Sequence, residues 1–500
     1  MKNLSTTILA LACCLALAAD AVAETWLVTP DGLGDFGTIQ AAIEAAEPGD
    51  VVELGDGVFT GPGNRDLDFL GKAITVRSQS GDAAACIIDC QGTVEENHRG
   101  VNFRSGETAD ARLEHLTITG GYRDVGNLPE GCGGAILVSD DSAPTLVGLI
   151  LRQNVAQSGG AIYVFTGSPV IAACLFLEND GWWGSGGGLG LYQYTASEPI
   201  TDCVFQANHS HQAGGGISAV QSDFALEACQ FMANTLTSGY GGGLECFMES
   251  VCEVTGCTFA DNVGDLGGGG AMFWWDSVGD LRRCTFAGNV SAQGSGIGAE
   301  DSQVTVLESI IAFGTGPSVR VTQGGTMTLG CCDVFGNSEG DWVGEIADQA
   351  GQAFNRSADP LFCGDANPEA PYSLQAESPC APGYPCPQIG AWTVGCGITG
   401  IAPALPDGEG LVLRGAAPNP FNPQTTITFG LDREQRVEVA VFDARGRQVA
   451  VLADRIFGAG ETSLRWDGRD AAGRDLASGV FLVRVRSAGQ TRTTKAVLIR

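Results

Sequence analysis

The chain has 500 residues, 73 of them glycine, and its 58 acidic and 27 basic side chains give a formal net charge of −31. Such an acidic surface repels nucleic acid and anionic lipid headgroups, which excludes both as partners. An acidic polysaccharide would need cations to bridge it to this surface. The length allows two or three domains, and glycine without a three-residue period indicates turns rather than collagen.

The N-terminus has the features of a secretory leader. Lys2 precedes an apolar run over residues 8–19, and the sequence Ala-Val-Ala at 21–23 offers a cleavage site between small residues. No later run is long enough to span a membrane. We therefore expect residues 1–23 to be a signal peptide and the mature chain to be secreted or displayed at the cell surface, in an oxidising environment.

A repeated phrase occupies the centre of the chain, from Gly133 to about Gly314. Two glycines followed by an apolar residue recur seven times, the last time in degraded form, at steps of 26, 28, 28, 27, 27 and 26 residues. Between them recurs an apolar residue followed three positions later by asparagine. A fixed period in the twenties indicates a solenoid, in which each repeat buries its apolar face against its neighbours.

The local period shows which solenoid to expect. Segments such as Cys257-Thr258-Phe259 alternate, which indicates short strands rather than helices. About 27 residues per turn with glycine corners predicts a right-handed parallel β-helix whose coils stack at about 4.8 Å, so that equivalent side chains form ladders. We expect asparagine at a corner to adopt left-handed dihedrals and to bond backbone amides, and the ladder cysteines to stay reduced. The predicted ladders are Phe176, Phe205, Phe231, Phe259 and Phe286; Cys174, Cys203, Cys229, Cys257 and Cys284; and Asn154, Asn179, Asn208, Asn234, Asn262 and Asn289.

The segment before the repeats predicts an end cap. A strand from Trp26 leads to a short helix with Ile39, Ala42, Ile43 and Ala46 on one face, and then to a strand over residues 51–54. This text resembles the opening of the pectin-lyase-like superfamily, including pectinesterases, in which the helix caps the open end of the β-helix. We therefore expect a cap at residues 24–60 and the β-helix at 61–330.

After the repeats, a loop-rich segment at residues 331–397 predicts disulfide staples. Four cysteines fall within 34 residues there, and three pairings among them are possible. Two further cysteines flank a short loop and form another candidate pair. The candidates are Cys363, Cys380, Cys386 and Cys396, with Cys246 and Cys252 in the repeats.

Residues 398–410 predict a linker, and residues 411–500 predict a separate domain. Six or seven alternating strands indicate a small antiparallel sandwich. The phrases Ala417-Pro418-Asn419-Pro420-Phe421-Asn422-Pro423, Leu464-Arg465-Trp466-Asp467-Gly468 and Lys495-Ala496-Val497-Leu498-Ile499-Arg500 resemble the C-terminal sorting domain of type IX secretion substrates, which is similar to the immunoglobulin-like (Ig-like) domain of flagellar hook-capping proteins. The resemblance implies an Ig-like fold and a partner in the secretion machinery. The fold class is therefore all-β: a right-handed parallel β-helix followed by a small antiparallel Ig-like β-sandwich.

The function inferred from the sequence is recognition. The glycine and asparagine phrases at about 133–290 resemble the repeats of polymorphic outer-membrane proteins, which are adhesins, and so imply adhesion to an extracellular glycan or surface protein. The alternative is a polysaccharide lyase or hydrolase of the pectin-lyase-like superfamily. The regular repeats hold only Arg152, Arg282 and Arg283 as strong bases, which favours a protein without catalysis.

Candidate chemistry is sparse. Glu245, Glu249 and Asp276 lie in equivalent parts of neighbouring coils and are the candidates for an acid pair or a Ca²⁺ site, although a solvated acidic edge is the favoured interpretation. His209 and His211 are interpreted as part of a solvated loop. We expect no metal site and no obligatory cofactor, with Ca²⁺ as the possible exception.

An aromatic stripe is the candidate binding surface. Aligning the coils on their glycine pairs places the first and third following residues inside and the fourth outside, which predicts that Val138, Val164 and Val220 face outward with three aromatic residues. An exposed aromatic stripe is what a glycan- or protein-binding face requires. The predicted binding residues are Tyr192, Phe247, Trp274, Trp275, Trp182 and Trp183.

Overall fold

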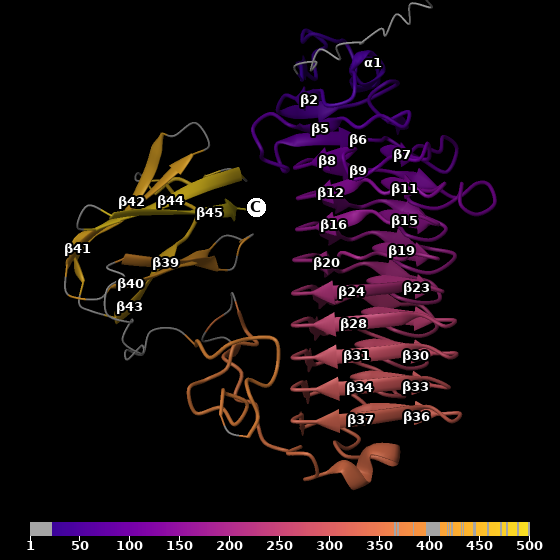
Figure 1. Ribbon diagram of the computed structural model, residues 1–500, viewed down its shortest axis with the longest axis vertical. Coiled ribbons are helices and arrows are strands. Elements are labelled where there is room, and N and C mark those ends of the chain that lie inside the picture. Colours follow the sequence, from indigo (N-terminus) through magenta and orange to yellow (C-terminus); the bar gives the residue numbers. More distant parts are fainter. Residues whose placement is uncertain are drawn as a thin grey trace, which may run out of the picture.

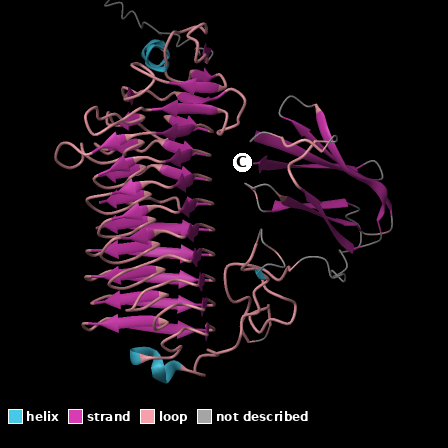
Figure 2. Cartoon of the chain, turned by 180° about the vertical axis from the view of Figure 1, so that it is seen from behind, coloured by secondary structure: helices cyan, strands magenta, loops and turns pink. Residues whose placement is uncertain are grey.

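The computed structural model describes residues 23–364, 367, 370–383, 385–396 and, with short gaps, 411–498. The expected leader, apart from Ala23, and the expected linker at 398–410 lie outside these residues. The first part of the chain is a right-handed solenoid of parallel strands, and the last part is a small unit of antiparallel strands (Figures 1 and 2).

Four parallel sheets, here called A, B, C and D, form the walls of the solenoid. Along a regular coil the chain passes through them in the order D, C, A and B. The twelve strands of sheet A are β1 (Thr25–Val28), β2 (Val51–Leu54), β5 (Thr75–Ser78), β8 (Arg112–Glu114), β12 (Thr145–Val147), β16 (Val170–Ala172), β20 (Ile200–Thr201), β24 (Asp223–Glu227), β28 (Val251–Thr255), β31 (Val278–Arg282), β34 (Gln303–Leu307) and β37 (Thr326–Gly330). The eleven of sheet B are β3 (Gly57–Phe59), β6 (Cys86–Asp89), β9 (Thr117–Thr119), β13 (Ile150–Arg152), β17 (Leu175–Leu177), β21 (Val204–Gln206), β25 (Gln230–Met232), β29 (Thr258–Ala260), β32 (Thr285–Ala287), β35 (Ile310–Ala312) and β38 (Asp333–Phe335).

Sheets C and D complete the coil. The ten strands of sheet C are β4 (Leu67–Asp68), β7 (Val101–Phe103), β11 (Ile136–Val138), β15 (Ile162–Phe165), β19 (Leu189–Tyr192), β23 (Ile217–Val220), β27 (Leu244–Phe247), β30 (Ala271–Trp274), β33 (Ile297–Glu300) and β36 (Val319–Thr322). The five of sheet D are β10 (Tyr122–Arg123), β14 (Val155–Ala156), β18 (Asp180–Gly181), β22 (His209–Ser210) and β26 (Thr235–Leu236).

The predicted Phe ladder is confirmed in the interior. Phe176, Phe205, Phe231, Phe259 and Phe286 are at most 1% exposed, and successive rings stack with centroids 4.4 to 4.9 Å apart. The Cys ladder is also buried, and its thiols are free, as expected. The Cys229 thiol, for example, lies 3.4 Å from the backbone oxygens of Ile200 and Glu227. Stacking of like residues therefore fills the core in the same way in every regular coil.

The Asn ladder is confirmed, with one correction. From Asn154 to Asn262, each asparagine donates its backbone N–H and its Nδ2 to the Oδ1 of the next asparagine, at 2.9 to 3.1 Å. The left-handed residue is the one before the asparagine and not the asparagine itself, as at Gln153, Ala233 and Asp261. The expectation of left-handed asparagines was wrong because the corner turns one residue earlier. The asparagine then points inward, where its amide satisfies buried backbone groups.

Both ends of the solenoid are covered. Helix α1 (Ile39–Ala45) lies over the first coils, capped by Thr38, and buries Ile39, Ala42 and Ile43 as predicted. At the other end, the 3₁₀ helix η1 (Gly344–Gln349) buries Ile346. These caps shield apolar side chains and strand edges that an open coil would expose.

The disulfides differ in part from the predicted set. Cys363 pairs with Cys396, whereas Cys386 pairs with Cys331, which the prediction did not include. Cys380 is a buried free thiol that donates to Asp333 at 3.0 Å. The candidate pair Cys246 and Cys252 is not bonded, because both side chains lie in the interior, on strands of sheets C and A, rather than beside a surface loop.

Residues 359–396, here called the C-terminal strap, return along the outside of sheet B. Trp392 Nε1 donates to Thr258 Oγ1 at 2.7 Å, and the backbone N–H of Ala391 donates to Thr285 Oγ1 at 2.9 Å. Leu374 and Ile389 pack with Ile310 of β35 in one buried cluster. The strap thus contacts three successive coils.

The C-terminal unit has seven described strands in two antiparallel sheets. One sheet contains β39 (Leu411–Ala417), β40 (Thr425–Leu431) and β43 (Gly460–Trp466), and the other contains β42 (Gln448–Phe457), β41 (Gln435–Asp443), β44 (Gly479–Ser487) and β45 (Gln490–Leu498). Their buried residues, including Phe421, Trp466 and Phe481, form one core. The small antiparallel domain is confirmed, and its Ig-like character stays a prediction.

Candidate functional site

The outer face of sheet C carries two columns of side chains along the solenoid. Successive residues of a strand point to opposite sides of the sheet, and the buried core takes alternate residues such as Ile162 and Val164. The residues between them face outward, and parallel pairing aligns them from coil to coil. One column is Tyr163, Gly190, Ser218, Glu245, Met272 and Gly298, and the other is Phe165, Tyr192, Val220, Phe247, Trp274 and Glu300.

Four aromatic residues of the second column, Phe165, Tyr192, Phe247 and Trp274, are here called the aromatic row. Phe165 and Tyr192 stack with centroids 5.1 Å apart and planes 6° apart, and Phe247 and Trp274 stack at 4.2 Å. All four side chains are half-buried. Trp275, beyond the end of β30, is 52% exposed and lies 5.3 Å from Phe247. The row therefore consists of two stacked pairs along the axis of the solenoid, with Val220 between them.

The prediction of which residues of this face point outward was wrong in the first two repeats. Val138 and Val164 are fully buried in the core, and the outward position that the prediction assigned to Val164 belongs to Phe165. Pairing aligns Ile162 with Leu189, so Ala161 takes the place of Gly188, the third glycine of the later repeats. The glycine pairs of the first two repeats therefore lie one residue out of frame with the alignment used for the prediction.

Glu245 is the buried carboxyl group of this face. Its side chain is 2% exposed, and its two oxygens accept hydrogen bonds from Ser218 Oγ at 2.5 Å and Trp274 Nε1 at 2.8 Å. Burial raises the pKa of Glu245 to about 7, although both hydrogen bonds oppose that shift. The carboxyl group therefore holds the Trp274 indole in place and is shielded from solvent.

The three carboxyl candidates do not form one cluster. Glu249 and Asp276 lie at the exposed turn between sheets C and A, both with left-handed backbones, and the N–H of Glu249 donates to the Trp275 carbonyl of the next coil at 3.0 Å. Within the described residues, no group of three or more His, Cys, Asp or Glu side chains is arranged to hold a metal ion. Glu249 and Asp276 thus follow the edge of the solenoid, and Glu245 lies apart under Trp274.

Trp182 and Trp183 lie elsewhere than the aromatic row. They follow β18 of sheet D, with exposures of 38% and 57% and ring centroids 5.5 Å apart. His209, expected in a loop, is in strand β22, and its two ring nitrogens lie 3.0 Å from the hydroxyls of Thr235 and Thr237. The predicted binding residues therefore fall on two different faces of the coil.

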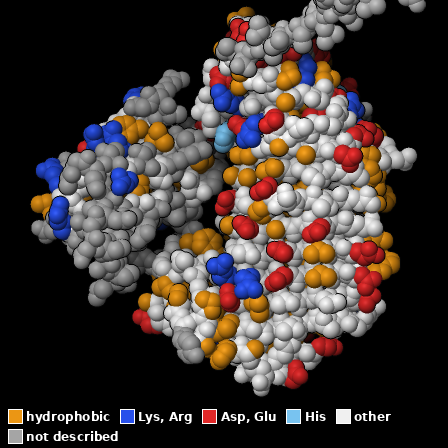
Figure 3. Space-filling view, in the orientation of Figure 1, with side chains coloured by type: hydrophobic (Ala, Val, Ile, Leu, Met, Phe, Trp, Pro, Cys, Tyr) orange, Lys and Arg blue, Asp and Glu red, His pale blue; other side chains and the backbone are white. Residues whose placement is uncertain are grey.

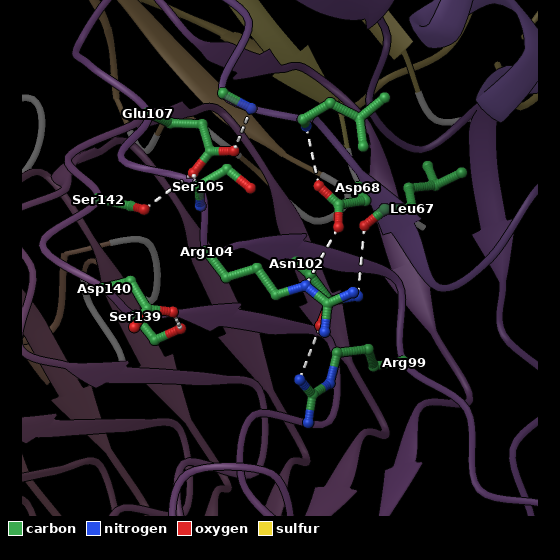
Figure 4. A network of polar contacts seen from close by, with 12 residues as sticks. Leu67, Asp68, Arg99, Asn102, Arg104, Ser105, Glu107, Ser139, Asp140 and Ser142 are labelled. Atoms are coloured by element: carbon green, nitrogen blue, oxygen red, sulfur yellow. Dashed lines mark hydrogen bonds and ion pairs between the residues drawn. The ribbon is translucent and has the colours of Figure 1, made fainter.

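Sequence reasoning missed polar residues at the N-terminal end of sheet C (Figure 4). Arg104 donates to Asp68 at 3.1 Å. The Arg99 guanidinium is almost fully buried, bonds Asn102 Oδ1 at 2.8 Å and the Cys132 carbonyl at 2.9 Å, and has its pKa lowered to about 9 by burial. These residues lie in irregular coils before the glycine phrases, so no repeat marked them. The strand register could have indicated them, because Asn102 pairs with Leu137 of the first regular coil.

Two families match parts of this chain. Residues 189–348 match the right-handed β-helix region, and residues 416–500 match the secretion system C-terminal sorting domain. The second match indicates a secreted or cell-surface protein. No curated protein matches the chain, and no helix among the described residues is long and apolar enough to cross a membrane.

Three solved structures illustrate the similarity. Pectate lyase Pel9A is 13% identical over 74% of this chain and 96% of its own, with a TM-score of 0.41. A mannuronic acid specific polysaccharide family 6 lyase from the human gut microbiota is 13% identical over 67% and 91%, with a TM-score of 0.30. PorZ, a surface component of the type-IX secretion system of Porphyromonas gingivalis, is 25% identical over 18% of this chain and 12% of its own, with a TM-score of 0.14.

Proposed function

We propose that this secreted protein recognises an extracellular glycan through the outer face of sheet C, without cleaving it. The observation that carries the proposal is the aromatic row, whose stacked rings stay half-exposed along several coils. The aromatic surface that stays exposed outside each stacked pair can bind the apolar C–H groups of sugars and leave the sugar hydroxyls in water. Because the row runs along the solenoid axis, an extended glycan chain can contact several rings at once.

The net charge of the protein determines which glycans we expect it to bind. The net charge of −31 opposes binding of uronate-rich polymers unless cations such as Ca²⁺ bridge the two. A neutral polysaccharide needs no such bridge, so we expect it to be the preferred ligand. Residues 416–500 would carry the recognition surface to the cell exterior through the secretion machinery, which suits an adhesin or surface coat.

A second candidate function is cleavage of a polysaccharide. The observation that favours it is Glu245, because a carboxyl group with a pKa of about 7 suits general acid or base work near neutral pH. Its 2% exposure and its two protein hydrogen bonds weigh against contact with a substrate. These contacts suit a role for Glu245 in holding Trp274 in place better than a role in catalysis.

Binding and cleavage are separated by one set of assays on the full-length secreted chain. Glycan arrays and affinity electrophoresis report binding, and release of reducing or unsaturated ends reports cleavage, each with and without Ca²⁺. Tyr192→Ala and Phe247→Ala are the informative variants, since Trp274→Ala would also remove a hydrogen-bond donor from Glu245. Phe354→Ala is the matched control, because Phe354 is 61% exposed at a turn outside sheet C.

We expect binding to neutral polysaccharide to weaken by at least about tenfold in both sheet C variants and to be unchanged in the control. Equal binding in all three variants would contradict the proposal. Product formation that is lost in Glu245→Gln would replace it with the enzymatic function. Binding to a protein but to no glycan would show that the outer face of sheet C binds a different class of ligand.

A further inference from the structure

The outer face of sheet D differs from that of sheet C. Its strands are only two residues long, and the second residue of each, such as Ala156, Ser210 and Leu236, is buried. The first residue therefore faces outward, as does the residue after the strand. Backbone pairing aligns these positions in two columns, which are Tyr122, Val155, Asp180, His209 and Thr235, and Asp124, Gln157, Trp182, His211 and Thr237.

Two carboxyl groups of this face have unused hydrogen-bonding capacity. Neither oxygen of Asp180 accepts a hydrogen bond from any described residue, and its Oδ1 is shielded from solvent. Asp124 accepts from the Tyr122 hydroxyl through Oδ2 at 3.2 Å, while its buried Oδ1 has no partner among the described residues. An oxygen that is shielded from solvent is also shielded from a ligand, and Asp124 Oδ2 is occupied by Tyr122. The group that can accept a hydrogen bond from a ligand is therefore Asp180, through its Oδ2.

Aromatic and imidazole groups surround these oxygens. Trp182 belongs to the column beside Asp180, and Trp183 follows it with 57% of its side chain exposed. His211 is half-buried in the next coil, about 4.8 Å along the stack, and influences the charge on Asp180. The two indoles and Asp180 thus share one coil with His211 in the next, whereas Asp124 lies two coils before Asp180.

We propose that this sheet D surface is a second saccharide-binding site, specific for a neutral sugar and separate from the aromatic row. Trp182 and Trp183 stack against the C–H face of the ring, and Asp180 and His211 bond its hydroxyl groups. Small polar sites of this kind combine an apolar platform with a few fixed polar groups. The site does not depend on the proposed function of sheet C.

The charges exclude the other ligand classes. A uronate or sulfated sugar would bring its anion against Asp180, which costs Coulomb energy at short distance. A metal ion would need free imidazoles, but both ring nitrogens of His209 lie within hydrogen-bond distance of threonine hydroxyls. Hydroxyl groups without charge satisfy the carboxylate oxygens without either conflict.

The test is calorimetric titration of the full-length chain with cellohexaose, mannohexaose and xylohexaose. Trp183→Ala removes a platform, and Asp180→Asn keeps the shape of the side chain but replaces the acceptor charge. Phe354→Ala is the matched control, because it removes an aromatic residue of similar exposure, 61%, from a turn outside sheets C and D. A Tyr192→Ala/Phe247→Ala double variant isolates sheet D from the aromatic row.

We expect the double variant to retain binding of one of these hexasaccharides, and Trp183→Ala and Asp180→Asn made in that background to weaken it at least about tenfold. Phe354→Ala in that background should bind as its parent does. Absence of binding to all three sugars, or equal binding with and without Trp183, would overturn the sheet D site. Neither result bears on the aromatic row, whose own failure would appear as unchanged polysaccharide binding in the double variant.

Discussion

Sheets A and C belong to the same coils, but their outer faces have different chemistry. The outer face of sheet A carries charged pairs in several coils, such as Arg77 with Glu53 at 2.8 Å and Arg282 with Glu308 at 3.8 Å. Acidic side chains are scattered over the solenoid surface seen in Figure 3. The outer face of sheet C instead carries the aromatic row. Because the outer face of sheet A carries polar side chains in the same coils, the fold does not require aromatic residues on the outer face of sheet C.

The largest expected effect comes from the interior that both sheets share. Asn234→Ala removes the Oδ1 that accepts from Asn208 and the Nδ2 that donates to Phe205 O and Asn262 Oδ1. Buried backbone groups are then left unpaired, so we expect a loss of about 3–4 kcal/mol in unfolding free energy, measured by urea denaturation. Gln206→Ala, at an exposed position of β21, is the control and should change little. A small effect of Asn234→Ala would show that the ladder is dispensable.

The second prediction concerns the pH dependence of stability that Glu245 of sheet C contributes. The pKa of Glu245 is about 7 in the folded protein against 4.5 for the free group, so the folded state holds an extra proton between these values. Stability therefore falls as pH rises from about 4.5 through 7, by up to about 3 kcal/mol from this group. Glu245→Gln should remove this part of the pH dependence and be the more stable protein at pH about 8.5. Parallel stability curves for the two proteins from acid to alkaline pH would contradict the assigned burial.

The third prediction tests the difference between sheets A and C by adding an aromatic residue to sheet C. Val220 is the aliphatic gap in the column between Tyr192 and Phe247. Val220→Tyr should extend the row, and an added ring contact is worth about 0.5–1.5 kcal/mol, which strengthens glycan binding about two- to tenfold. Affinity electrophoresis measures this gain, and Val278→Tyr on the outer face of sheet A, at a residue 40% exposed, is the control. An equal gain from both variants would show that any aromatic residue on the solenoid suffices.

The smallest effect is expected on sheet A. Arg282→Ala removes one partly exposed ion pair, which should change the unfolding free energy by less than about 0.5 kcal/mol and leave glycan binding unchanged. Urea denaturation and the glycan assay measure both. A loss of binding in this variant would move the recognition surface away from sheet C.

Most of the interior could be predicted from the sequence, because the same residue type recurs at the same position of each coil. The Phe176 to Phe286 ladder and the asparagine ladder needed only the period and the alternation. The turn geometry was less accessible, since nothing in the repeats distinguishes a left-handed Ala233 from a left-handed Asn234. The pairing of Cys386 with Cys331 was missed because the staples in this segment were sought only among the four cysteines from Cys363 to Cys396.

The candidate sites could be predicted only in part, because outward positions do not repeat. The aromatic residues on sheet C were identified from register, but the one-residue change of frame hid Phe165. The burial of Glu245 depends on Trp274 of the next coil covering it, which a single-coil pattern does not contain. The sheet D surface needs the pairing of Asp180 with His209, and only the stacked coils bring those residues together.

The C-terminal strap changes how the solenoid bears force. A pull on the chain beyond Cys396 acts first on the Cys363–Cys396 bond and on the strap, and it reaches the last coil through the Cys331–Cys386 bond, because Cys331 lies between β37 and β38. The strap is bonded to Thr258 and Thr285 in neighbouring coils, so the load is spread sideways over several rungs in shear. A solenoid pulled at its last coil would instead peel one rung at a time. The strap therefore shares a load from the C-terminal side among the last coils of the rod.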